Sequence, residues 1–268
     1  MKRTLLLGSL LLLIILSVAA GFAGAKGEPS GEDAAGPGAP AFARGQDLQE
    51  RGQYEEALKA YQEALKARPG WPEAYLQQGL TLASLERYEQ AAAAFAQAAR
   101  LNPDWGAAQE NLGAAYAKLG RWSEARQAFE KAVRLHPAEA EAHYHLGLAL
   151  GKLGQDQAAR EEFAQAVRLD PGMAKAHKNL GMAYANLNRW DQAGESFQEA
   201  VRLRPGDPEA HYALCAYYLH VGDRQAALKE YQTLQGLDQK LARKLAELLE
   251  GPSPAAPPAA PGPKKEHP

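Results

Sequence analysis

Residues 111–137 read NLGAAYAKLGRWSEARQAFEKAVRLHP, and the same pattern returns at a fixed distance along the chain. Six positions carry it: Leu112, Gly113, Tyr116, Ala125, Phe129 and Pro137. A step of 34 residues forward leads to Leu146, Gly147, Leu150, Ala159, Phe163 and Pro171, and the next step to Leu180, Gly181, Tyr184, Ala193, Phe197 and Pro205. A fixed period of this length indicates a stack of structural repeats rather than one globular core.

The pattern L-G-x-x-Y, A-x-x-x-F and P at this period resembles the tetratricopeptide repeat, and the resemblance covers about Gly38 to Gln239. It implies an all-α fold, a right-handed superhelical solenoid of about six helix-turn-helix units and a C-terminal capping helix. The expected units are residues 38–71, 72–105, 106–139, 140–173, 174–207 and 208–237, and the capping helix is residues 238–250.

The turn inside each unit has its own signature. Glycine or asparagine, which tolerate the left-handed conformation that ends a helix, recurs at Gly52, Gly120, Gly154, Asn188 and Gly222. Glu86 takes this place in the second unit, so we expect that turn to close differently. Proline, which costs about 3 kcal/mol inside a helix, follows the second helix at Pro69, Pro103, Pro137, Pro171 and Pro205.

Small residues at repeated positions predict close packing of the two helices in each unit. Glycine recurs at Gly45, Gly79, Gly113, Gly147 and Gly181, and Cys215 takes the equivalent place in the sixth unit. We therefore expect Cys215 to be a small buried residue rather than a reactive thiol. Aromatic rings are expected to fill the space between units, at Tyr61, Phe95, Phe129, Phe163, Phe197 and Tyr231.

Composition and motifs argue against several classes of function. The formal net charge of -2 gives no support to nucleic-acid binding, and a single cysteine excludes an intramolecular disulfide. His143, His177 and His211 are one period apart, so they form a column along the stack, too widely spaced to share a metal ion. We find no nucleophile elbow, phosphate-binding glycine loop or hydrolase motif. The chain is predicted to be no enzyme and to hold no cofactor and no metal.

The amino-terminal segment, residues 1–25, resembles a secretory signal peptide. Lys2 and Arg3 precede a charge-free run from Leu5 to Ala25, and Ala23-Gly24-Ala25 offers a cleavage site. An uncleaved inner-membrane anchor is the alternative, because the run is nearly long enough to span a bilayer. Both interpretations place the repeats outside the cytoplasm, periplasmic or secreted, and the second tethers them through residues 5–25. Residues 26–37 read as a flexible linker and residues 251–268 as a disordered Pro/Ala-rich tail.

The candidate binding surface lies on the first helix of each unit. At about 100° per residue, the second, fifth, ninth and twelfth positions cluster opposite the packing positions. In proteins that this chain resembles, that side lines the concave surface of the superhelix and holds ligands. The predicted partner-binding residues there are Phe42, Gln46, Leu76, Leu80, Glu110, Ala114, Tyr144, Leu148, Lys175, Lys178, Met182, Tyr212 and Leu219. Convex, edge and tail surfaces remain the alternative sites.

Some members of the family grip a terminal carboxylate with lysine at the fifth position and asparagine at the ninth. Here Lys178 is followed at the ninth position by Met182, so we predict no such clamp.

The leading hypothesis is a non-catalytic interaction scaffold of the cell envelope, which binds a peptide or amphipathic helix of another protein in the concave groove. A self-associating structural protein is the second hypothesis. An accessory subunit of an envelope assembly or biogenesis complex is the third.

Overall fold

The computed structural model describes residues 36–249. Within these residues the chain forms helices and no strand, as the all-α prediction requires. The helices are α2 (Ala39–Glu50), α3 (Tyr54–Ala67), α4 (Pro72–Ser84), α5 (Tyr88–Leu101), α6 (Gly106–Lys118), α7 (Trp122–Leu135), α8 (Ala140–Lys152), α9 (Asp156–Leu169), α10 (Ala174–Asn186), α11 (Trp190–Leu203), α12 (Pro208–Val221), α13 (Arg224–Leu237) and α14 (Gln239–Leu249). The predicted signal peptide or anchor, the tail and most of the linker lie outside the described residues.

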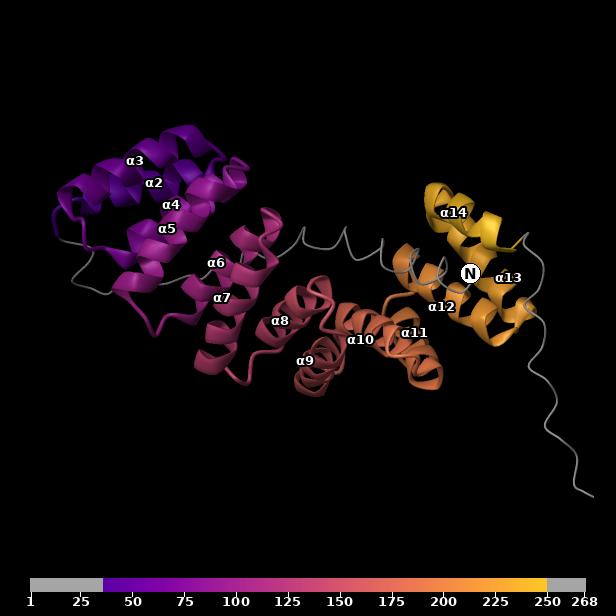
Figure 1. Ribbon diagram of the computed structural model, residues 1–268. Helices are drawn as coiled ribbons and strands as arrows, with labels where there is room; N and C mark the ends of the chain where they lie inside the picture. Colours follow the sequence, from indigo (N-terminus) through magenta and orange to yellow (C-terminus); the bar gives the residue numbers. More distant parts are fainter. Residues whose placement is uncertain (1–35, 250–268) are drawn as a thin grey trace, which may run out of the picture.

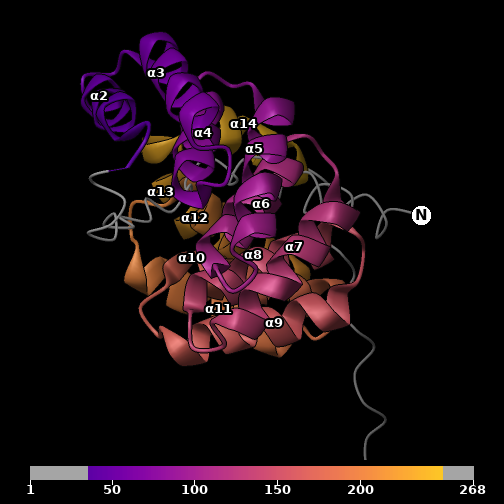
Figure 2. The same cartoon turned by 90° about the vertical axis from the view of Figure 1, so that its left-hand side faces the viewer.

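Twelve of these helices form six consecutive antiparallel pairs, and each pair packs on the next. From α5 to α13, each helix begins 34 residues after its counterpart in the preceding pair. The pairs descend from α2 and α3 to α8 and α9 and rise again toward α12 and α13 (Figure 1). A view from the α2–α3 end shows the pairs turning progressively about the stack (Figure 2). This arrangement confirms the predicted helical solenoid.

The turns inside the units adopt one conformation throughout the array. The turn residue has a positive φ at Gly52, Glu86, Gly120, Gly154, Asn188 and Gly222. The expectation that the Glu86 turn closes differently is therefore wrong, since Glu86 has φ 58 beside 71 at Gly120. The packing of the two flanking helices decides the backbone here, and the glutamate accepts a conformation that costs roughly 1–2 kcal/mol for a residue with a Cβ.

The repeated glycines provide the space for the aromatic rings. A Cβ added to Gly113 would lie 2.6 Å from Cε1 of Phe129, and one added to Gly147 would lie 2.7 Å from Cε1 of Phe163. The rings thus pack between the two helices of one unit, whereas from the sequence we expected them between units. Phe129 packs within its own unit and also contacts the next one, because it stacks on His145 with 5.4 Å between ring centroids.

The last helix covers the open end of the array, as predicted. α14 packs on α12 and α13, with Leu241, Ala242 and Leu245 buried against them. Lys240, Arg243 and Lys244 are exposed on its other side. A repeat array needs such a terminal element, because the last unit has no neighbour to cover its apolar face.

Candidate partner-binding groove

The first helices of the six units line the inner side of the curved stack. α2, α4, α6, α8, α10 and α12 each contact the first helix of the adjoining unit. No contact of comparable extent joins successive second helices in residues 36–249. Because neighbouring elements approach most closely on the short side of a curved stack, these six helices form its concave surface, here called the inner face.

The thirteen predicted binding residues divide by exposure. Part of the side chain is exposed at Gln46, Leu80, Ala114, Lys175 and Leu219. The side chain is buried at Phe42, Leu76, Glu110, Tyr144, Leu148, Lys178, Met182 and Tyr212. Periodicity thus identified the side of each first helix that faces inward. It did not distinguish residues exposed on that side from residues buried against a neighbouring helix. Whether any of these residues binds a partner stays a prediction.

The buried aromatic residues of the candidate set pack against other rings. Phe42 lies against Trp71, with 4.4 Å between ring centroids, and also against Tyr61. The Tyr144 ring lies 5.9 Å from that of Phe163, and its hydroxyl accepts a hydrogen bond from Nδ2 of Asn179 at 3.2 Å. The ring contacts of Phe42 and Tyr144 therefore lie within one unit, and the hydrogen bond from Asn179 to Tyr144 is the contact here that reaches the next unit.

The two lysines of the candidate set already hold ionic partners. Nζ of Lys175 lies 2.6 and 2.7 Å from the two carboxylate oxygens of Glu141 and 4.6 Å from the centroid of the Tyr144 ring. Nζ of Lys178 lies 3.1 Å from Asp207 and 2.6 Å from Glu209. The Lys178 side chain is only 8% exposed, so its ammonium group is committed to these pairs rather than free for a terminal carboxylate.

Glu110 is the unusual member of the set. It is 7% exposed, and its Oε1 has no hydrogen-bond partner. Burial, followed by the charges of Glu139 and Glu141, raises the pKa of this carboxyl group to about 7. A carboxylate that leaves water without a cation carries a large desolvation cost. Helical periodicity missed Glu139, because this residue precedes α8 in the turn between units.

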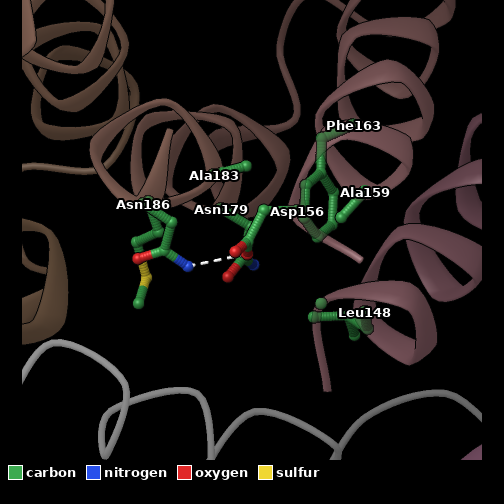
Figure 3. Close-up of a pocket in the computed structure, with 9 residues that line it drawn as sticks. Leu148, Asp156, Ala159, Phe163, Asn179, Ala183 and Asn186 are labelled. Atoms are coloured by element: carbon green, nitrogen blue, oxygen red, sulfur yellow. Dashed lines mark hydrogen bonds between the residues drawn. The ribbon is translucent and has the colours of Figure 1, made fainter. Parts of the chain in front are cut away.

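A small pocket opens where α8, α9 and α10 meet, close to Leu148 (Figure 3). Nδ2 of Asn186 donates a hydrogen bond to Oδ1 of Asp156 at 2.8 Å across it. Its free space is about 10 Å³, which is room for roughly one water molecule. A wider depression of about 420 Å³ is lined by residues of α3, α4 and α5, among them glutamines such as Gln62 and Gln90 and apolar residues such as Leu58.

The histidine column has a structural role in the repeats. Nε2 of His143, His177 and His211 each lies within 3.1 Å of the carbonyl oxygen of the proline six residues before it. Nδ1 of His143 and of His211 also lies 2.6 Å from a glutamate carboxylate on the second helix of the same unit. These contacts tie the preceding turn and both helices together. Within residues 36–249, no group of three or more metal-ligating side chains is placed to hold a metal ion.

Burial also shifts the pKa of two other side chains. Burial, opposed by the charge of Glu141 and aided by that of Lys175, lowers the pKa of His145 to about 4. Burial raises the pKa of the Cys215 thiol to about 12, and Sγ lies 3.1 Å from the carbonyl oxygen of Ala227. The prediction of a small buried cysteine is confirmed.

In the described part of the chain, no helix is both long and apolar enough to cross a membrane.

Comparison with known proteins agrees with this architecture. A tetratricopeptide repeat family model matches residues 42–104, 144–208 and 178–242, and a second model described as TPR repeat matches residues 113–154. The chain has no significant match among curated protein sequences.

Solved structures of the same architecture are numerous. MamA (41-end) from Desulfovibrio magneticus RS-1 is 30% identical, with a TM-score of 0.60, and the similarity covers 63% of this chain and 96% of that one. YrrB, described as a TPR protein with an unusual peptide-binding site, is 26% identical with a TM-score of 0.60, over 71% and 99% of the two chains. PilF from Pseudomonas aeruginosa, at 16% identity and a TM-score of 0.67 over 79% and 97%, shares the fold. On the family match, which spans more than half of its residues, this chain belongs to the tetratricopeptide repeat family.

Proposed function

We propose that this chain is a non-catalytic scaffold protein of the cell envelope that holds a peptide or an amphipathic helix of another protein on its inner face. The observation that carries the proposal is the line of partly exposed residues along that face. Gln46, Leu80, Ala114, Lys175 and Leu219 come from five of the six units. A ligand that follows this line would contact several units at once.

The chemistry of the line suits an extended or helical ligand. Leu80 and Leu219 offer apolar contacts, while Ala114 leaves room for a ligand backbone between them. The similarity to YrrB, a protein of this family described with a peptide-binding site, supports the same kind of ligand. Apart from Glu110, we expect the buried residues of the candidate set to shape the face rather than to touch the partner.

The envelope location rests on the sequence of residues 1–25. Lys2 and Arg3 before the charge-free run favour a cytoplasmic amino terminus and an exported array. Fractionation of cells, combined with amino-terminal sequencing of the mature protein, tests this. Recovery of the full chain from the cytoplasm would contradict the location.

The binding test uses two matched pairs of substitutions in the full chain. Leu80→Arg with Ala114→Arg fills the inner face, whereas Leu169→Arg with Ala93→Arg places the same side chains on exposed positions of the second helices. Peptides are selected on the wild-type chain from a random 12-residue display library. We expect the inner-face variant to lose at least tenfold in affinity, or roughly 1.4 kcal/mol, and the control variant to bind as the wild type does. The opposite pattern would place the site on the second helices.

Self-association remains a second candidate because of the exposed apolar residues in the last unit. Val221, Leu228 and Leu237 are 47%, 42% and 42% exposed. Light scattering over a range of concentrations tests it. An oligomer that resists dilution and dissociates with Leu228→Lys would favour this function over partner binding.

A further inference from the structure

Equivalent junctions between units can be compared directly, because the repeat places equivalent residues in equivalent surroundings. At the junction of the fifth and sixth units, Lys178 of α10 meets two carboxylates at the start of α12. Its Nζ lies 3.1 Å from Oδ2 of Asp207 and 2.6 Å from Oε2 of Glu209. Oδ1 of Asp207 also accepts hydrogen bonds from the first backbone N–H groups of α12.

Two units earlier, the same three positions carry three acidic residues. Moving back 68 residues from each leads to Glu110, Glu139 and Glu141. The start of α8 thus carries two acidic residues as the start of α12 does, while Glu110 stands at the position equivalent to Lys178. In this region Nζ of Lys175 pairs with Glu141, at 2.6 Å from Oε2.

The replacement leaves a group that the protein itself does not satisfy. Glu110 is 7% exposed, and its Oε1 has no hydrogen-bond partner. Both charged neighbours that act on it, Glu139 and Glu141, are of the same sign. Native proteins seldom bury such an oxygen without a partner, because no hydrogen bond replaces the water that it loses.

We propose that Glu110, with Glu139 and Glu141 beside it, receives a cationic side chain, lysine or arginine, from the peptide bound on the inner face. The inference rests on the proposed function and specifies what the partner must carry. Lys178 shows which group fits: an ammonium between two carboxylates at the start of the next first helix. The partner supplies at the junction of the third and fourth units the positive charge that Lys178 supplies at the junction of the fifth and sixth.

A divalent metal ion is a poorer occupant. Among the described residues no three ligating side chains converge closely enough for one. A guanidinium or ammonium group reaches carboxylates several ångströms apart by means of separate N–H donors. The remaining alternative is a proton shared within the acidic group, and the experiment separates the two.

The experiment uses the peptides selected on the full wild-type chain at pH 8. We expect them to share a lysine or arginine at one position. Replacing that residue by norleucine or citrulline should lower affinity at least tenfold. Glu110→Gln should lower the affinity of the basic peptides by a similar factor and leave the norleucine and citrulline versions unchanged. Glu89→Gln, which removes the same charge from an exposed site on α5, should change neither.

Glu110→Lys provides a second test, in which a loss of binding cannot be explained by a loss of stability. The new lysine would face Glu139 and Glu141 as Lys178 faces its own two carboxylates. We expect a higher melting temperature together with loss of basic-peptide binding, because the chain then occupies its own site.

The outcomes separate the two levels of the proposal. Selected peptides without a shared basic residue, or basic peptides that bind Glu110→Gln as tightly as wild type, would overturn the cation site and identify Glu110 as a carboxyl that only holds a proton. Failure to select any peptide sensitive to Leu80→Arg with Ala114→Arg would overturn the proposed function itself.

Discussion

Substitution of Gly113 by alanine tests the packing on which every unit depends. Gly113 lies in the middle of α6, and its missing side chain leaves space for the ring of Phe129. An added Cβ would lie 2.6 Å from Cε1 and 2.7 Å from Cδ1 of that ring. Two carbon atoms are at their best separation at about 3.5–4.0 Å. The ring would therefore have to retreat by about 1 Å, although Phe129 is only 3% exposed.

Two opposing contributions set the size of the effect. Overpacking of a buried site costs roughly 1–3 kcal/mol. Replacing glycine by alanine inside a helix recovers up to about 1 kcal/mol of helix propensity. For Gly113→Ala we therefore expect a net loss of roughly 1 kcal/mol, and at most about 2, in the free energy of unfolding.

Gly236 supplies a matched control within the same chain. It lies in α13, and a Cβ added there would meet no heavy atom within 4 Å. Gly236→Ala should therefore stabilise the chain by about 0.5–1 kcal/mol. Because the propensity gain is common to both variants, the difference between them isolates the overpacking, at roughly 1–3 kcal/mol.

Urea unfolding followed by far-ultraviolet circular dichroism measures both variants. Adding Phe129→Leu to Gly113→Ala should recover part of the loss, with a coupling of roughly 0.5–3 kcal/mol in the double-mutant cycle. Equal stability of Gly113→Ala and Gly236→Ala, or a coupling of zero, would refute the claim that glycine makes room for the ring.

Three further substitutions or treatments test single features of the chain. Glu110→Gln should stabilise the chain by roughly 3 kcal/mol at pH 8 and by little at pH 4.5. The reason is that a folded pKa of about 7 makes the wild type lose stability as pH rises from 4.5 to 7; urea titrations that give the same gain at both pH values would contradict this. Glu86→Gly should raise stability by about 1 kcal/mol, since glycine adopts positive φ without strain, and Asn188→Gly should gain less in the same thermal melts. The Cys215 thiol should resist an aromatic disulfide reagent at pH 8 until denaturant is added, and prompt labelling of the native chain would show that it is not buried.

The repeat made the architecture predictable from the sequence, because its rules are local. Proline at 69 or 103 ends a helix wherever it stands, and glycine at 113 faces an aromatic ring 16 residues later in the same unit. Glu86 shows the limit of such rules. The residue type predicts a different turn, yet the two helices on either side impose the same φ as in the other units.

For the candidate binding face, periodicity predicted the side of each first helix but not how deeply each residue is buried. Periodicity places Leu80 and Leu76 on one side of α4, yet Leu76 is 1% exposed and Leu80 is partly exposed. Exposure depends on how closely the neighbouring first helix approaches, and that is a property of the curvature rather than of any one helix. The same holds for Lys178, whose partner Asp207 lies 29 residues away in a turn that helical spacing does not describe.

A repeat protein allows its own units to serve as controls for one another. Because the backbone returns to the same place, a difference in side chains at equivalent positions is a difference in chemistry at constant geometry. Lys178 and Glu110 form such a pair. The residues equivalent to Asp207 and Glu209, which face Lys178, are Glu139 and Glu141 beside Glu110. A third acidic residue, Glu110, at the position equivalent to Lys178 adds repulsion and desolvation at a buried position. Under our proposal a positive charge of the bound peptide compensates the acidic group, and this asymmetry between two equivalent junctions is the reason for placing the cation site at the junction of the third and fourth units.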